Sequence, residues 1–272
     1  MRSMTKAKVR RKPSRKASPK ARTKRPKGAE PTVRRRVITL AAMVLALVGG
    51  LVFLFFFSAA FVVKDVRVTG VEGELAESVE RLAQVPNGRP LARVSEGRVS
   101  ERVLQDLRVA GVSVDSDWTD SVVTLSATPR EPALVLRQGG STWLSDVGGV
   151  VYDEVEKPSN KLPSVVVPTR PTELGEGTVQ GLVELWRTRP DPAELEGELS
   201  TPRLDKNGMV SMTVDGLTIL WGEPVEAEKK WQIIRALVAQ ESIDPQGGIE
   251  QTIDVSLPGT PVVTGIPEAP RG

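Results

Sequence analysis

The stretch Lys206 to Gly222, KNGMVSMTVDGLTILWG, holds the strongest local folding signal in this 272-residue sequence. Asn207-Gly208 and Asp215-Gly216 are both dipeptides that favour type I′ hairpin turns. Apolar and polar residues alternate over Met209–Val214, and the alternation continues after the second turn as far as Trp221. This period of two is typical of half-buried strands. The stretch therefore predicts three strands of an antiparallel meander.

Helices and further strands are expected on both sides of the meander. Thr178–Arg187 and Glu226–Glu241 carry apolar residues at helical spacing, and Thr252–Ser256 is a last strand that Pro258 ends. The Trp residues of this region lie in the apolar phase of their elements, so we interpret them as packing residues and not as a ligand cage. Residues 132–257 thus form a mostly antiparallel β domain with flanking helices, and 258–272 a flexible C-terminal tail. The expected strands before the meander are Ala133–Arg137, Thr142–Ser145, Val150–Glu154 and Val165–Val167.

A smaller module with the order β-α-α-β-β is expected over residues 61–131. Its strands are Phe61–Thr69, Val112–Trp118 and Ser121–Ala127, and its helices are Glu74–Gln84 and Ser95–Arg108. Two amphipathic helices on one face of a three-stranded sheet can bury both apolar stripes. The fold class is therefore α+β.

An uncharged run of 27 residues from Val37 to Val63 precedes this module. A membrane-spanning helix needs about 20 apolar residues, so residues 37–60 predict a single transmembrane helix. Lys and Arg are far more abundant before the run than after it, and this bias keeps the N-terminus in the cytoplasm and exports residue 64 onward. A cleaved signal peptide is the alternative, since Ser58-Ala59-Ala60 offers small residues, but the basic leader is long for one.

The first 36 residues form a basic arm with 16 Lys/Arg and one acidic residue, Glu30. The rest of the chain holds 21 Lys/Arg and 33 acidic residues, a net charge of −12. The arm is poor in apolar residues and rich in Pro, so residues 1–36 are expected to be a disordered cytoplasmic tail. Its attachment to a membrane span favours anionic lipid as its ligand. No aromatic residue interleaves the charges, and nucleic acid is not expected.

The chain has no Cys and no His, which excludes thiol nucleophiles, disulfides, ordinary zinc sites and triads based on His. Asp146, in a loop beside Gly148-Gly149, is the most obvious candidate for a catalytic carboxylate, yet an Asp that bonds turn amides is the simpler interpretation. No phosphate-binding glycine loop followed by Lys-Ser/Thr occurs. We therefore expect no catalytic residue, cofactor, metal or small-molecule substrate.

Several ordered segments resemble the bacterial cell-division family FtsQ/DivIB. The first module, from Val66-Arg67-Val68-Thr69-Gly70 through Ala110-Gly111-Val112 to Arg130-Glu131-Pro132-Ala133, is similar to the POTRA domain of that family. The meander, Leu220-Trp221-Gly222, a helix and then Ile253-Asp254-Val255 before Pro258 resemble its β domain. The family's Glu-Arg-x-Pro-Val-Ala is replaced here by Pro129-Arg130-Glu131-Pro132-Ala133.

The resemblance implies a division scaffold at the septum of the plasma membrane, without enzymatic activity, that binds proteins of the FtsB/DivIC and FtsL types. It also implies that partners bind at the end of the β domain. A strand at a sheet edge leaves main-chain groups unpaired for a partner, so the predicted partner-binding residues are Thr252, Ile253, Asp254, Val255 and Ser256. Two alternatives remain open, namely an envelope enzyme that acts on cell-wall polymer with a carboxylate pair, and a POTRA-bearing secretion or assembly factor.

Overall fold

The structure, a computed structural model, describes residues 31–57, 61–243 and 250–266. Its first element is the helix α1, Pro31–Phe57. Within it, Val33–Leu54 has a mean hydropathy of 2.7 and no buried residue, and it is long and apolar enough to cross a membrane. The helix begins earlier than the expected residue 37, because Pro31 suits the first helical position and Arg34, Arg35 and Arg36 are good helix formers. Residues 1–30 and 58–60, which include most of the basic arm, lie outside the described residues.

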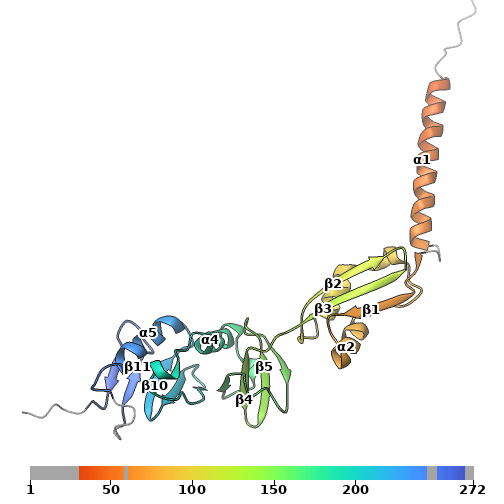
Figure 1. The fold of residues 1–272 in the computed structure, drawn as a ribbon. Helices are drawn as coiled ribbons and strands as arrows, with labels where there is room; N and C mark the ends of the chain where they lie inside the picture. The colour runs from red at the N-terminus through yellow and green to blue at the C-terminus, as the bar shows by residue number, and fades with distance from the viewer. Residues whose placement is uncertain (1–30, 58–60, 244–249, 267–272) are drawn as a thin grey trace, which may run out of the picture. The chain divides into compact units, whose positions relative to one another are not determined.

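A mixed module of three strands and two helices follows, in the predicted order β1-α2-α3-β2-β3 (Figure 1). The central strand β3 pairs in parallel with β1 and antiparallel with β2. Buried residues alternate along β3 and face a core that both helices share, for example Val79 and Val103 against Leu125. One face of the sheet is therefore covered, as the amphipathic patterns require. The bounds are β1 Asp65–Thr69, α2 Gly73–Ala83, α3 Glu96–Val103, β2 Val109–Asp117 and β3 Val122–Pro129.

Two predictions in this module are too long. The strand expected from Phe61 begins only at Asp65, although Val62 forms an isolated bridge with Pro90. The helix expected to reach Arg108 ends at Val103, because a turn follows in which the Asp106 carboxylate is fixed by hydrogen bonds. Ser78 Oγ donates to Asp106 Oδ2 at 2.7 Å, and Arg108 donates to both carboxylate oxygens at 2.9 and 2.8 Å. These bonds, those from Arg108 first, lower the pKa of Asp106 from 3.8 to about 2.

A nine-stranded sheet makes up the rest, in the order β12-β11-β10-β9-β8-β7-β4-β5-β6. Five of its eight strand pairs are antiparallel, so the prediction of a mostly antiparallel sheet is confirmed. Its first strands are β4 Leu134–Gln138, β5 Ser141–Ser145, β6 Val151–Glu154, β7 Ser164–Val166 and β8 Arg203–Leu204. The other elements are α4 Glu176–Arg187, β9 Val210–Val214, β10 Leu217–Gly222, α5 Ala227–Val238, β11 Thr252–Asp254 and β12 Val262–Thr264.

The two turns of the meander differ in type. Asp215 and Gly216 both have a positive φ, as a type I′ turn requires. At the other turn only Gly208 has a positive φ, so the type I′ prediction for Asn207-Gly208 is wrong. Asp205 causes the difference, because its Oδ1 accepts hydrogen bonds from the main-chain N–H of Asn207 and Met209, both at 2.8 Å.

Candidate functional site: the β12 edge of the large sheet

The predicted partner strand Thr252–Ser256 does not lie at a sheet edge. Its first three residues form β11, which pairs in parallel with β10 and antiparallel with β12. The expectation of an edge is therefore wrong, because Val262–Thr264 adds one more strand in a segment predicted to be loose tail. The edge at this end of the sheet is β12.

The predicted residues have different surroundings around β11. Ile253 and Val255 are completely buried in the core of the large sheet, and Thr252 is half-buried. Asp254 Oδ1 accepts a hydrogen bond of 2.8 Å from the N–H of Ser256, which closes the turn after the strand. These five residues support the edge from behind and do not form it.

Hydrogen bonds between β10 and β11 fix which way the main chain of β11 faces. Thr218 N–H donates to the carbonyl oxygen of Gln251, and Val255 N–H donates to that of Leu220, both at 2.9 Å. In a parallel pair such bonds recur at every second residue. The odd-numbered residues of β11 therefore turn their main-chain groups toward β10, and the even-numbered residues turn theirs toward β12.

The same alternation identifies the open groups of β12. Thr252 lies opposite Thr264 and Asp254 opposite Val262, so these are the hydrogen-bonded pairs of the antiparallel ladder. Val263, between them, directs its N–H and C=O away from the sheet. A partner strand can pair with these groups.

The side chains beside this edge divide into two faces. On the inner face, the row Ile219–Ile253–Val263 packs on the core. On the outer face, Leu220, Asp254 and Val262 form a second row across β10, β11 and β12. Val262 is 52% exposed and Leu220 is 40% exposed. An added strand would thus find apolar neighbours on both faces.

Charge distinguishes β12 from the other edge strand of this sheet. The edge strand β6 contains Asp153 and Glu154, and charged side chains protect an edge against pairing. In the smaller sheet the edge strands β1 and β2 also carry Asp residues. Among the edge strands of the described residues, β12 alone has no charged residue.

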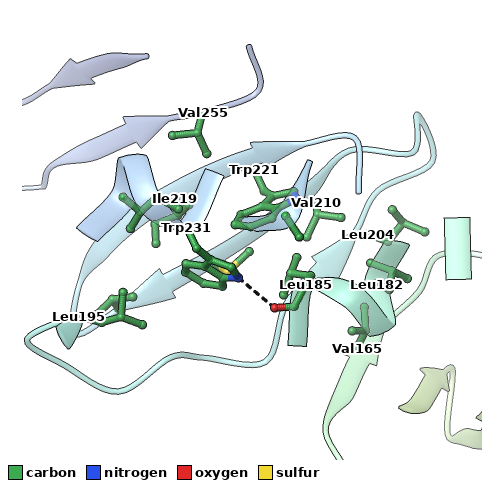
Figure 2. Close-up of a cluster of buried hydrophobic side chains, with 14 of the residues drawn as sticks. Val165, Leu182, Leu185, Leu195, Leu204, Val210, Ile219, Trp221, Trp231 and Val255 are labelled. Carbon is green, nitrogen blue, oxygen red and sulfur yellow. Dashed lines mark hydrogen bonds between the residues drawn. The ribbon is translucent and has the colours of Figure 1, made fainter. Parts of the chain in front are cut away.

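The helix α5 anchors the strands behind the edge (Figure 2). Trp231 lies against Trp221 of β10, with ring centroids 4.8 Å apart, and its Nε1 donates to the Leu185 carbonyl oxygen at 2.9 Å. Lys230 is fully buried, and its Nζ donates to the carbonyl oxygens of Trp221 and Glu223 at 2.8 Å. Burial lowers the pKa of Lys230. Trp221 and Trp231 are packing residues, as predicted, and they hold β10 in place.

A sequence signal for β12 exists. Two β-branched Val residues and Thr264 stand between Pro261 and Gly265, a short β-rich run with breakers at both ends. Gly265 has a φ of +80°, and a Cβ there would lie 2.3 Å from the Glu250 carbonyl oxygen. Only glycine fits this close approach, which ends the strand.

Asp146 has a structural role, as expected from its loop. Its Oδ1 accepts a hydrogen bond of 2.9 Å from the N–H of Val150, and its Oδ2 forms an ion pair with Arg130. Arg130 Nε in turn donates to the Leu107 carbonyl oxygen at 2.8 Å. Both oxygens of the carboxylate are thus engaged in holding the chain.

Comparison with known proteins gives consistent relatives, although no protein-family profile matches the chain. It is 28% identical to cell division protein FtsQ of Streptomyces venezuelae over 240 residues, which cover 86% of this chain and 85% of that protein. It is 28% identical to FtsQ of Streptomyces griseus over 210 residues, or 74% and 96% of the two chains. FtsQ of Mycobacterium tuberculosis H37Rv is also 28% identical, over 86% of this chain and 71% of the relative.

These relatives support a role in cell division, and α1 agrees with a single-pass membrane protein. The similarity extends over most of the chain and agrees with the resemblance seen in its ordered segments. Together these similarities support the FtsQ/DivIB family as the family of this chain.

Proposed function

We propose that this chain is a non-enzymatic scaffold of the division machinery that binds FtsB/DivIC-type and FtsL-type membrane proteins through the β12 edge. The observation that carries the proposal is the outward N–H and C=O of Val263 on an uncharged edge strand. Strand addition uses such groups for affinity and the neighbouring side chains for specificity. The partner-binding role first given to Thr252–Ser256 thereby moves to the adjacent strand, with β11 as its support.

The arrangement around the membrane belongs to the same proposal. The basic arm lies in the cytoplasm beside anionic lipid and both folded modules lie outside the cytoplasm, a topology that the charge bias across α1 supports. The element order of the smaller module supports its interpretation as a POTRA domain, and the strand meander in the large sheet supports the interpretation of that sheet as the family's β domain. Such a protein is enriched at the septum.

Co-purification from membranes tests the proposal. The full chain is compared with a variant that lacks residues 262–272, and a variant that lacks only 267–272 is the matched control. We expect the full chain and the control to retain the FtsB/DivIC-type and FtsL-type proteins, and the variant without β12 to lose them. Thermal unfolding checks that all three chains are folded. Undiminished partner recovery without β12 would exclude this edge as the binding site.

A further inference from the structure

Four arginines line one recess on the smaller module. Arg89, Arg93, Arg98 and Arg102 surround a volume of about 150 Å³, and no acidic residue lines it. The concentration of positive charge is unusual here, since residues 37–272 have a net charge of −12. A cluster of positive charge on a part of the chain that is otherwise net negative indicates an anionic ligand.

Regular elements hold three of these arginines in place, and Arg89 lies in the loop before them. Arg98 and Arg102 are four residues apart on α3, so they share a face of the helix. Arg102 is fixed, because its Nε donates to the Leu82 carbonyl oxygen at 3.2 Å and its Nη2 to that of Ala83, at the end of α2. Arg93 ends a short 3₁₀ helix that begins at Leu91. Arg98 and Arg102 are like charges on one helix face and repel each other, and a bound anion would relieve this repulsion.

Chain connectivity keeps the recess near the membrane. Val63 N–H donates to the Arg89 carbonyl oxygen at 2.8 Å, and Gly88 N–H donates to that of Val63 at 2.7 Å. Five residues lie between Val63 and the end of α1 at Phe57, and the six steps from residue to residue span at most about 22 Å. This limit holds for any angle between the helix and the module, and on either side of the membrane.

An aromatic residue lies beside the same segment. Lys64 N–H donates to the Ser121 carbonyl oxygen at 2.8 Å, next to the turn that joins β2 and β3. Trp118, in that turn, packs on Phe61 with ring centroids 6.2 Å apart and is still 41% exposed. Trp is enriched at the membrane–water interface. The start of the module thus combines a partly exposed Trp with an arginine recess.

We propose that this recess binds the phosphate of an anionic lipid headgroup, of the phosphatidylglycerol or cardiolipin class. Guanidinium groups form paired, charge-assisted hydrogen bonds with phosphate oxygens. The lipid would hold the smaller module against the membrane on which α1 anchors it. This site is separate from the β12 edge and does not depend on the proposed partner binding.

A local probe is needed to test the site, because the basic arm also attracts anionic lipid. The chain has no Cys, so Asn87→Cys gives a single labelling position at the exposed loop before Arg89. The full chain, labelled there with a donor fluorophore, is placed in nanodiscs of phosphatidylcholine alone or mixed with phosphatidylglycerol. Energy transfer to a headgroup-linked acceptor then reports the approach of the module to the lipid surface.

Three sets of substitutions give the comparison. The first neutralises the recess without touching Arg102, the second keeps its charge, and the third removes three exposed positive charges from the larger module. The Gln set is Arg89→Gln with Arg93→Gln and Arg98→Gln. The Lys set changes the same three positions to Lys. The control set is Lys157→Gln with Arg170→Gln and Lys206→Gln.

Phosphatidylglycerol is expected to increase energy transfer in the unsubstituted chain. The Gln set should shift the docking equilibrium away from the surface at least about tenfold, because each cation near an anionic surface contributes about a fivefold effect, and three together about a hundredfold, before salt screening reduces it. The Lys set should retain most of the docking and the control set all of it, with circular dichroism showing that each chain is folded.

Other results would overturn the proposal. Docking that is independent of phosphatidylglycerol, or equal losses in the Gln and control sets, would exclude the recess as a lipid site. If the unsubstituted chain bound inorganic phosphate saturably while phosphatidylglycerol left energy transfer unchanged, the site would be one for free phosphate and not for a headgroup.

Discussion

Proline at two adjacent positions of β12 separates partner pairing from internal pairing. Val263→Pro removes an N–H that points away from the sheet, whereas Thr264→Pro removes an N–H that bonds to β11. Proline also restricts the preceding residue to extended conformations, which both positions already have as strand residues. Only the first substitution should therefore leave the stability of the fold unchanged.

The magnitudes follow from one hydrogen bond in each case. A main-chain hydrogen bond contributes about 1 kcal/mol net, so Val263→Pro should weaken partner binding at least about fivefold and leave the free energy of unfolding almost unchanged. Thr264→Pro should destabilise the module by about 1 kcal/mol, a decrease in melting temperature of roughly 2–4 °C for a region of this size.

The assay combines partner binding with hydrogen exchange of the Val262 amide, which bonds to β11. In Val263→Pro this amide should stay protected while the affinity for the partner ectodomains falls. In Thr264→Pro its protection should be lost. Val263→Ala is the control for the side chain, since it keeps the outward N–H. Unchanged affinity in a folded Val263→Pro chain would refute strand addition at β12.

Three further predictions follow from the structure. Asp106→Asn should lower the free energy of unfolding by about 2 kcal/mol at neutral pH. The pKa of Asp106 is about 2 in the folded chain and 3.8 ordinarily, so this stability exists above pH 4 and is lost as the pH falls toward 2. Denaturant unfolding should therefore show the difference in stability between the two chains closing over that range. Trp231→Phe leaves the buried Leu185 carbonyl without its 2.9 Å donor and should lower the free energy of unfolding by about 3 kcal/mol, measured by urea denaturation; a loss under half of that would show that the bond is replaced. A reporter fused after Gly272 should be active only outside the cytoplasm, and a cytoplasmic signal would reverse the topology.

Much of the fold could be predicted because its signals are local. The alternation before and after Asp215-Gly216 and the apolar stripes of α4 and α5 correspond to elements that the structure contains. The helix end at Val103 could not be predicted in this way, because the apolar stripe continues to Leu107. There the turn depends on Asp106 and its bond to Ser78, which is 28 residues away in sequence.

The partner-binding strand predicted from the sequence lies one strand away from the sheet edge, for a similar reason. The alternation over Thr252–Ser256 identifies a strand but cannot show how many neighbours it has. Pro258 and Gly259 indicate a turn, and the apolar run after it is too short to distinguish a strand from a loose tail. The pairing of Asp254 with Val262 depends on the tertiary structure, and the alternation of apolar and polar residues does not reveal it.

The placement of β12 makes the edge a late product of folding. Among the residues that the structure describes, β12 pairs only with β11, and β11 reaches its parallel neighbour β10 only after the chain has passed through α5. Pairings between residues so distant in sequence form slowly compared with hairpins. During synthesis the β12 edge therefore cannot exist until the chain through Thr264 has emerged. A partner that binds β12 would select chains in which the large sheet is complete, and chains that lack part of the sheet would be excluded from assembly without any separate quality check.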